Sequence, residues 1–550
     1  MGFGVCISHR ISRGVLGWKF GSLLPGLKIA RDQMARHIVQ VDVIVPVHNA
    51  AETLEETVLS AMHQNIPQEL IPTLDDYELY VRVCCYDDGS TDGSWEILLK
   101  LQQKYSDLNV QDATSSRKTS QTIIPSRLLI AKSSDGVGRG AGYARNRAAE
   151  LSQTLCDSSS SEIDNDSRNG IQPFLCLLDS DDVMDSTRVA EQISGMLALP
   201  PDERLKTLMG CRVVRDPPES TWHYTSWANN LTEERLLLER FREVTLLQPT
   251  WMMCRSRFEE LNGYIEAPKP GEDVVNLISA SLDDGQTAVL RLIHPTFDTP
   301  QTLRLAEDLR FFHAHLYANG LLRLHKSTSN PDKPLLTYRH RHNQSQSYST
   351  SRKLLLHLRA LAFEWNVLRN RPTPATSNVT PTPWNNHDGK FVVWGAGRDG
   401  KDFVKALSED ARKRVYCFLD VDHKKIQQGY YTNRDLNLKI PIVHFSLLVK
   451  DLQTQKKLLE ENTNFGLINK SKAAKPPGDN QPATKKQKTL EKQQPVVVAA
   501  LPQVAKALDL RMLVELPVVV CVAMNRTSGA LENNVAAVGR QEGFDLWHFN

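Results

Sequence analysis

Three carboxylates stand within four positions of this 550-residue chain, at Asp179, Asp181 and Asp182. They directly follow the apolar run at residues 174–178, whose length and composition predict a buried strand of an α/β sheet. Ligands of such sheets bind beyond the carboxyl ends of the strands. Carboxylates this close together repel one another unless a hard cation or the hydroxyl groups of a sugar lie between them. A helix cap requires only one aspartate, so we interpret the cluster as a metal or sugar site.

Polar residues also follow the other strands that the N-terminal half predicts. These strands are the apolar runs at residues 41–45, 79–86 and 128–131. The first ends at Pro46, His48 and Asn49, and the second ends at Asp88. Helical patterns separate the strands, and this alternation predicts an α/β fold with a mostly parallel sheet. Because the carboxyl ends of parallel strands meet at one edge, we expect these polar side chains around a single crevice.

A glycine-rich loop at residues 136–142 follows the third strand and leads into a helix that carries Arg145 and Asn146. The glycines are explained structurally by a tight turn into the helix. An arginine near a helix N-terminus also adds positive charge to free N–H groups, a combination that suits a phosphate. The convergence of four strand ends favours the functional interpretation.

Further candidate side chains lie downstream of the opening cluster. Two Glu-Asp pairs occur, at residues 272–273 and 307–308, and a strand-like stretch then leads to His340 and His342. Histidines in such a basic stretch are usually surface residues. A strand that brings a histidine beside carboxylates would also complete a metal site.

A second unit begins with the apolar run at residues 391–394, followed by Gly395, Gly397 and Gly400. This is the dinucleotide fingerprint G-x-G-x-x-G, and Asp420 supplies the acid that the motif places about 20 residues on. The unit is therefore predicted to be Rossmann-like. Whether its glycine turn binds a nucleotide stays open.

The composition limits the class of protein. The net charge is only +2, so bulk charge argues neither for nor against a polyanionic partner. The nine cysteines contain no C-x-x-C pair, and several lie in strand-like runs, which favours buried, reduced thiols. No apolar run approaches the roughly 20 residues that cross a bilayer. We therefore predict no membrane span and a cytoplasmic location.

Taken in order, the N-terminal motifs resemble those of the family 2 glycosyltransferases, which have the GT-A fold. They are Val43-Ile44-Val45-Pro46-Val47-His48-Asn49, Asp87-Asp88-Gly89-Ser90-Thr91-Asp92, Ala144-Arg145-Asn146, Leu178-Asp179-Ser180-Asp181-Asp182 and a downstream Glu-Asp pair. The resemblance covers residues 40–350. It implies inverting transfer of a sugar from a nucleotide-sugar donor, with Mn²⁺ or Mg²⁺ as the metal.

The resemblance also implies a role for each matching residue. The donor would be bound by Pro46, His48 and Asn49 at the uridine, Asp88 at the uracil, Arg145 and Asn146 near the uracil and phosphates, and Asp179 at the ribose. Asp181 and His342 would hold the metal, and Asp308 would be the general base. His340 stays open as an alternative to His342, and Asp273 as an alternative to Asp308. Asp182 is predicted to begin a helix rather than to bind a ligand.

A narrower resemblance is to the galactosyltransferases that modify queuosine in tRNA. Its motifs are Cys211-Arg212-Val213-Val214-Arg215-Asp216-Pro217-Pro218, Ala306-Glu307-Asp308-Leu309-Arg310-Phe311-Phe312, Trp394-Gly395-Ala396-Gly397, Phe418-Leu419-Asp420-Val421-Asp422 and Gly543-Phe544-Asp545-Leu546-Trp547-His548-Phe549. It implies UDP-galactose as the donor and queuosine in the anticodon of tRNA-Tyr as the acceptor. The alternatives are a β-1,3-N-acetylglucosaminyltransferase acting on glycans, a nucleotide-dependent oxidoreductase, and a sugar or RNA binder without activity.

These patterns predict four parts of the chain. The parts are a basic N-terminal extension at residues 1–39, a GT-A domain at 40–369 with insertions near 157–170 and 267–302, a linker at 370–389, and a Rossmann-like domain at 390–550 with a disordered Lys-rich insertion at 451–495.

Overall fold

The computed structural model describes most of the chain between His37 and Phe549. The described residues are 37–112, 123–153, 172–268, 292–294, 296–340, 350–369, 382–451, 453–454, 504, 507–523 and 529–549. Several predicted features lie outside them: residues 1–36, the insertion at 157–170, Asp273, His342 and most of the Lys-rich insertion.

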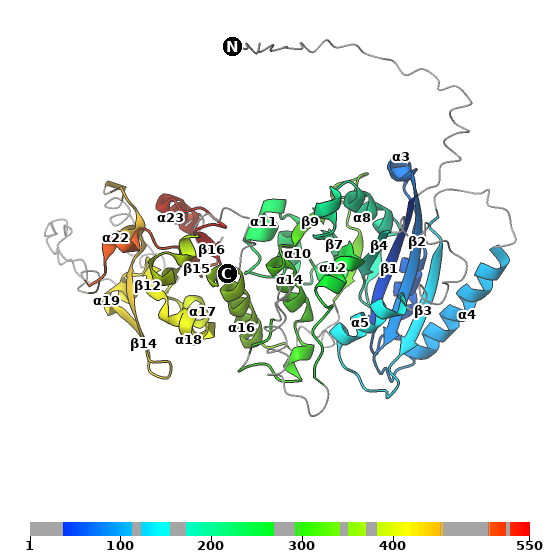
Figure 1. The fold of residues 1–550 in the computed structure, drawn as a ribbon, viewed down its shortest axis with the longest axis horizontal. Coiled ribbons are helices and arrows are strands. Elements are labelled where there is room, and N and C mark those ends of the chain that lie inside the picture. Colours follow the sequence, from blue (N-terminus) through cyan, green and yellow to red (C-terminus); the bar gives the residue numbers. More distant parts are fainter. Residues whose placement is uncertain are drawn as a thin grey trace, which may run out of the picture.

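Two β-sheets lie at opposite ends of an elongated molecule, with helices between them (Figure 1). The N-terminal sheet has seven strands in the order β3-β2-β1-β4-β8-β6-β9, and the C-terminal sheet has six. The predicted fold class, a mostly parallel α/β sheet with a second C-terminal α/β unit, is confirmed.

The first four strands of the N-terminal sheet are parallel and carry the predicted polar ends. They are β1 (His37–Val47), β2 (Tyr77–Asp87), β3 (Ser126–Lys132) and β4 (Gln172–Leu177). The other strands are β8 (Met252–Cys254), which runs antiparallel to β4, then β6 (Thr207–Cys211) and β9 (Leu321–His325). Val47 pairs with Asp87 and Ile44 pairs with Leu177, so the strand ends lie at one edge of the sheet.

Alternating apolar residues on β1 bury both faces of this sheet. Val41, Val43 and Val45 pack in one core with α2 (Leu54–Met62) and α4 (Ser94–Asp112). Ile44 packs in the opposite core with α5 (Ala141–Leu151). A strand buried on both faces carries an almost continuous apolar run, and this explains why residues 41–45 predicted a strand so clearly.

A small three-stranded sheet stands beside the main one. Its order is β5 (Val183–Met184), β10 (Leu336–Arg339) and β7 (Val213–Asp216). The strand β10 runs antiparallel to β5 and parallel to β7. Residues after position 336 are thereby brought next to the carboxylates that precede β5.

The C-terminal sheet has the order β13-β14-β12-β11-β15-β16. Its strands are β11 (Phe391–Trp394), β12 (Val415–Asp420), β13 (Tyr430–Asn433), β14 (Leu438–His444), β15 (Val518–Val520) and β16 (Leu546–His548), of which only β13 is antiparallel to its neighbour. The predicted glycine turn joins β11 to α17 (Arg398–Ala406). Gly395 has φ +111°, and a Cβ on Gly400 would lie 1.9 Å from the Gly395 carbonyl oxygen, so both positions require glycine.

Asp420, the acid of the dinucleotide fingerprint, forms hydrogen bonds with groups of the protein itself. Asp420 accepts hydrogen bonds from the Ala396 N–H at 2.8 Å and from Lys425 Nζ at 2.9 Å. Its other oxygen accepts the Val421 and Asp422 N–H groups, at 2.9 Å each. Asp420 therefore ties the glycine turn to the end of β12, which is a structural reason for the motif.

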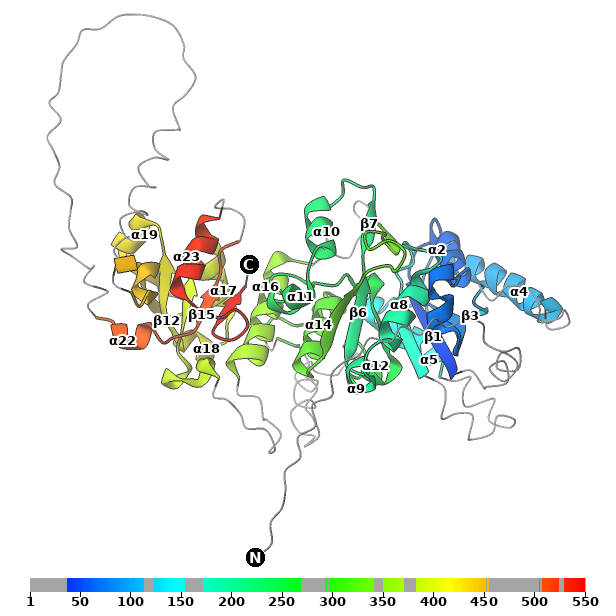
Figure 2. The ribbon, with the colours of Figure 1, turned by 90° about the horizontal axis from the view of Figure 1, so that it is seen from above.

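An apolar layer joins the C-terminal unit to the rest of the chain. Helix α16 (Arg352–Phe363) lies between the two sheets in both ribbon views (Figures 1 and 2). Phe363 packs edge-to-face on Trp384 and on Phe403 of α17, and Phe549 also contacts Phe403. Trp384 falls within the segment predicted as a linker, yet it is 3% exposed and donates to the Phe544 carbonyl at 2.7 Å.

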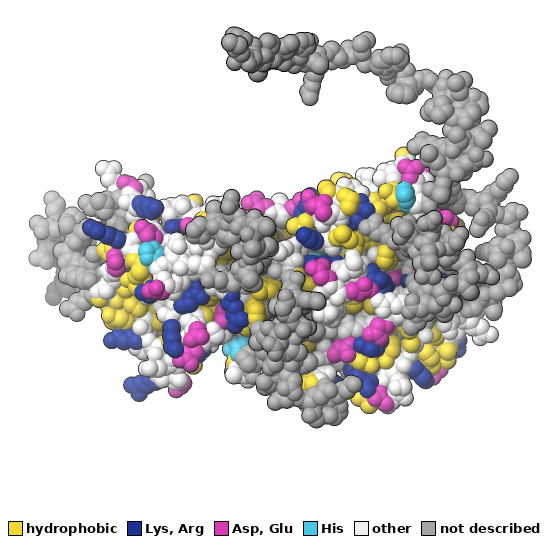
Figure 3. Space-filling model, in the orientation of Figure 1, with side chains coloured by type: hydrophobic (Ala, Val, Ile, Leu, Met, Phe, Trp, Pro, Cys, Tyr) yellow, Lys and Arg dark blue, Asp and Glu magenta, His cyan; other side chains and the backbone are white. Residues whose placement is uncertain are grey.

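The remaining helices surround these sheets. They are α3 (Ile71–Leu74), α8 (Arg188–Leu197), α9 (Pro201–Arg204), α10 (Trp222–Asn229), α11 (Glu233–Leu238), α12 (Arg255–Glu260), α14 (Glu307–Tyr317), α18 (Glu409–Lys413), α19 (His423–Gln428), α22 (Leu510–Leu513) and α23 (Ala530–Val538). Within the described ranges, none of the helices has both the length and the apolar character that crossing a membrane requires. On the face shown in Figure 3, acidic and basic side chains are interspersed over the described surface.

Candidate active site

The three carboxylates of the opening cluster lie immediately beyond the end of β4. Asp182 is 0% exposed, and its Oδ1 accepts the Arg339 N–H at 2.9 Å. Its Oδ2 is buried without a hydrogen-bond partner. Burial first, and then the charges of Asp181 and Asp179, hold the pKa of Asp182 well above its usual range. Asp179, Asp181 and Asp182 therefore lie close enough for their charges to interact.

The prediction that Asp182 begins a helix is wrong. The strand β5 follows it at once, and the next helix, α8, begins only at Arg188. The reason is that β5 begins directly after Asp182 and pairs with β10. The side chain of Asp182 therefore accepts a backbone N–H of β10 instead of capping a helix.

The strand β10 lies next to this cluster. Burial and the carboxylates of Asp182 and Asp179 raise the pKa of the Tyr338 hydroxyl. His340 follows the strand, and its N–H donates to the Asp216 carbonyl at 2.8 Å. His340 directly follows Arg339, whose N–H binds Asp182, so its backbone lies next to the carboxylate cluster. His342 lies outside the described residues.

The donor chemistry of this cluster fits a hard divalent cation. Among the described residues, no group of three or more His, Cys, Asp and Glu side chains is arranged to hold a metal ion. Mg²⁺ is often bound by only one or two carboxylates, with substrate phosphates and water completing its shell. The charges of Asp181 and Asp179 raise the pKa of Asp182, and the buried Oδ2 of Asp182 has no partner. Both observations match such a site.

Asp88 lies at the end of β2 and is 2% exposed. Its Oδ2 accepts the N–H groups of Arg139 and Gly140, at 2.7 Å each, and so joins the strand end to the glycine-rich loop. His48 Nδ1 donates to the Asp88 carbonyl at 2.9 Å. The Oδ1 of Asp88 is buried without a partner, and burial raises the pKa of this carboxyl. An acceptor atom is therefore unused among the converging strand ends.

Asn49 joins two of the converging loops. It has φ +50°, a conformation that asparagine tolerates better than most residues. Its Oδ1 accepts the Thr91 N–H at 2.8 Å, and its own N–H donates to Ser90 Oγ at 3.0 Å. Pro46, three residues earlier, pairs with Tyr86 inside the sheet. Asn49 thus holds the loops after β1 and β2 together.

The two predicted site residues of α5 bind protein groups. Arg145 binds Asp179 Oδ1 at 2.6 Å and Glu307 Oε1 at 2.8 Å. Asn146 holds the segment around Tyr264: its Oδ1 accepts the Tyr264 N–H at 2.9 Å, and its Nδ2 donates to the Tyr264 carbonyl at 3.0 Å. Asn146 therefore orders a neighbouring loop.

Asp308 lies in the first turn of α14, after Ala306 at φ +54°. It is half-buried, and its Oδ1 accepts the adjacent Leu309 N–H at 2.7 Å. Burial and then the charge of Glu307 raise the pKa of Asp308 to about 7. A carboxylate with this pKa exchanges protons readily near neutral pH, as a general base must.

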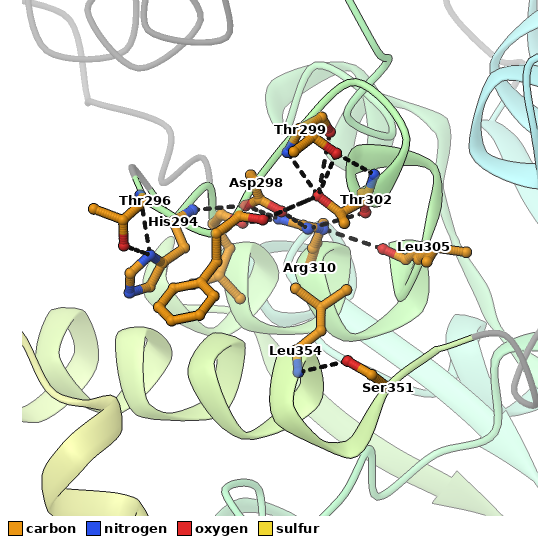
Figure 4. Close-up of polar contacts among 11 residues, drawn as sticks. His294, Thr296, Asp298, Thr299, Thr302, Leu305, Arg310, Ser351 and Leu354 are labelled. Atoms are coloured by element: carbon orange, nitrogen blue, oxygen red, sulfur yellow. Dashed lines mark hydrogen bonds and ion pairs between the residues drawn. The ribbon is translucent and has the colours of Figure 1, made fainter.

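A buried arginine holds the chain that leads into this helix. Arg310 donates to both oxygens of Asp298, at 3.0 and 2.6 Å, and to the Leu305 carbonyl at 3.2 Å (Figure 4). Asp298 also accepts from the His294 N–H at 2.6 Å and from Thr302 Oγ1 at 3.0 Å. These contacts fold the segment before α14 onto the helix. The ion pair between Arg310 and Asp298 was not predicted from the sequence, because no residue spacing marks a buried ion pair.

We expect Asp298→Asn to lower the free energy of unfolding by about 1.5–3 kcal/mol, the usual contribution of hydrogen bonds to a charged group. An amide would turn its own N–H₂ toward donors that only an acceptor can satisfy. Urea denaturation measures the change. The matched control is Asp332→Asn, at a carboxylate whose side chain is 84% exposed. An equally small change in both variants would contradict the role of Asp298.

Residues 42–119 match the family model described as glycosyl transferase family 2. The matched region contains β1 from Asp42 onward, all of β2, and the loops that carry His48, Asn49 and Asp88. The chain contains a family 2 glycosyltransferase domain. It is therefore a nucleotide-sugar glycosyltransferase.

Two solved structures of TarS from S. aureus are similar to this glycosyltransferase. Residues 1–349 of TarS in complex with UDP-GlcNAc share 13% identity with it, cover 78% of this chain and 92% of their own, and give a TM-score of 0.34. A longer TarS structure shares 14% identity, covers 68% of this chain and 50% of its own, and also gives 0.34.

Proposed function

We propose that this glycosyltransferase transfers galactose from UDP-galactose to queuosine in the anticodon of tRNA-Tyr, with inversion and with Mn²⁺ or Mg²⁺. The observation that carries the transferase chemistry is Asp308, a half-buried carboxylate whose pKa is raised to about 7. It directly follows Glu307, which forms one end of the Arg145 bridge. At the other end of that bridge is Asp179, in the carboxylate cluster beyond β4. The acceptor is taken from the narrower sequence resemblance.

The uridine of the donor would lie among the ends of β1, β2 and β3. The buried, unpartnered Oδ1 of Asp88 suits the imide N–H of uracil, because an unused buried acceptor is costly without a donor. Pro46 and His48 would line this part of the site, and Asn49 would hold the loops that form it. Asp179 would accept hydrogen bonds from the ribose hydroxyl groups.

The diphosphate would lie at the carboxylate cluster. Asp181, with His342 or His340, would hold the divalent cation there. When bound, such an ion supplies positive charge that stabilises the departing diphosphate. The bond of Asp182 to β10 positions its carboxyl group next to Asp181 and Asp179.

Asp308 would act on the acceptor. It would remove the proton of the attacking hydroxyl group while that oxygen forms its bond to the anomeric carbon and the bond to the UDP oxygen breaks. The proton stays on Asp308, and the leaving group departs as UDP on the opposite face, so the configuration inverts. With a pKa of about 7, Asp308 is ionised in about half of the molecules at neutral pH.

Buried thiols support a tRNA acceptor over a glycan of the secretory lumen. The seven cysteines that the structure describes are all buried, and none of these seven forms a disulfide. Secreted and lumenal proteins commonly form disulfides, whereas reducing compartments keep thiols free. An enzyme of a reducing compartment has access to tRNA.

The test incubates the full-length protein and Mn²⁺ with UDP-galactose, UDP-glucose or UDP-GlcNAc and queuosine-containing tRNA-Tyr. Mass analysis of the digested nucleosides is expected to show one added hexose on queuosine with UDP-galactose. The matched control is the same tRNA without queuosine, which should gain nothing. Absence of hexose on queuosine would overturn the proposal. Transfer of GlcNAc to a galactose-terminated oligosaccharide would instead establish the alternative function.

A further inference from the structure

Arg145 bridges two carboxylates that come from distant parts of the chain. One of its terminal nitrogens lies 2.6 Å from Asp179, beyond β4, and the other lies 2.8 Å from Glu307, the first residue of α14. Asp179 belongs to the proposed donor side of the site. Glu307 directly precedes Asp308, the proposed base. The guanidinium of Arg145 therefore connects the proposed donor side of the site to the helix that carries the proposed base.

The surroundings of Arg145 leave little of it available to a ligand. The side chain is 3% exposed, and the guanidinium lies 5.6 Å from the centre of the Tyr264 ring. Its Nε is buried without a partner. A planar guanidinium holds two carboxylates in a fixed geometry, which a lysine cannot do with its single charged nitrogen.

We propose that Arg145 and Glu307 are positioning residues: their ion pair holds the first turn of α14, and hence Asp308, at a fixed place relative to Asp179 and the donor. This inference rests on the proposed role of Asp308 as the base. It differs from the role that the family resemblance implies, in which Arg145 contacts the uracil and phosphates.

The charges around Asp308 give Glu307 a second effect. The groups that face Asp308 are Glu307 on the same helix, Glu243 after α11, Arg145 on α5 and Tyr224 on α10. Arg145 is shared with Asp179, so it only partly offsets the negative charges. Besides burial, the charge of Glu307 makes the largest contribution that raises the pKa of Asp308.

Two substitutions separate the effect of the Glu307 charge from the effect of the Arg145 ion pairs. Glu307→Gln keeps an oxygen that accepts from Arg145 but removes the charge. We expect the acidic limb of the kcat/KM profile to move to lower pH by on the order of one pH unit, because a like charge near the base is lost. Arg145→Lys keeps the positive charge but removes the planar guanidinium that binds two carboxylates at once. It should lower kcat about tenfold or more at every pH.

Donor affinity supplies the readout that distinguishes positioning from donor binding. Calorimetry with UDP and Mn²⁺ should give a Kd within about twofold of wild type for Arg145→Lys. The matched control is Arg147→Lys on the same helix, whose partners Glu150 and Glu266 lie nearer the surface, and which should leave kcat unchanged. A tenfold weaker UDP affinity with unchanged kcat at saturating donor would make Arg145 a donor ligand and overturn the proposal. An unmoved acidic limb in Glu307→Gln would also overturn it.

Failure of the proposed function can be distinguished from failure of the positioning role. In that case wild-type protein transfers no sugar to the tRNA, whatever the variants do. Hydrogen exchange in the peptide over residues 305–316 still tests the bridge, since it requires no turnover. Faster exchange in Arg145→Lys than in Arg147→Lys is expected, and equal exchange would overturn the positioning role.

Discussion

Asp308→Asn is expected to lower kcat by about 10²–10⁴-fold, the usual contribution of a general base. Asparagine has nearly the same shape and can still accept the Leu309 N–H, but it cannot take the proton of the acceptor hydroxyl. Because Asp308 would act on the acceptor, the affinity for UDP should change little. Initial rates of hexose transfer and calorimetric titration with UDP measure the two quantities.

The control for this variant is Asp402→Asn on α17, where an exposed carboxylate pairs with Lys405 and lies outside the proposed site. It should retain wild-type kcat. Full activity in Asp308→Asn would show that the base lies elsewhere. Asp273, in the other Glu-Asp pair, would then be substituted next.

The raised pKa of Asp308 also gives a pH dependence with a definite sign. Since the ionised form is the base, kcat/KM should rise with pH through an acidic limb near pH 7. A carboxyl whose pKa rises on folding destabilises the folded protein as pH increases from its ordinary value of 3.8 through about 7. Asp308→Asn should therefore be more stable than wild type at pH 8, and this difference should vanish near pH 3.

Asp181→Ala is expected to lower kcat by about 10³-fold or more, because a metal at a departing diphosphate contributes several kcal/mol to transition-state stabilisation. It should also remove the dependence of the rate on Mn²⁺ concentration. Rates measured from micromolar to millimolar Mn²⁺, after chelation of bound metal, test both effects. Titration with UDP, with and without Mn²⁺, should show that the metal no longer strengthens UDP binding.

The neighbouring Asp185 supplies the control for the metal. Its carboxylate is bound by Thr187 and by Lys333 Nζ at 2.8 Å, contacts that stabilise the loop rather than the proposed donor site. Asp185→Asn should keep the wild-type response to Mn²⁺. A wild-type response in Asp181→Ala would contradict its assignment as a ligand.

The sequence predicted the frame of the site well, because the signals that it used are local. Apolar runs at β1, β2 and β4 are buried on both sides, and the polar residue that ends each run marks the edge of the sheet. Placing Asp88 and Asp179 at the same edge followed from the parallel strand order alone. The family match over residues 42–119 agrees with that frame.

Tertiary structure alone decided how the individual side chains are used. Arg145 and Glu307 are 162 positions apart, and Asp182 meets Arg339 across 157 positions, so no spacing predicts either contact. The sequence also does not predict that Oδ1 of Asp88 lacks a partner, since whether a buried oxygen forms a hydrogen bond depends on all of the groups around it. Residue type and local period therefore determined which groups reach the edge of the sheet. Long-range packing determined which carboxylates are paired, which are left unpaired, and at what pH they hold a proton.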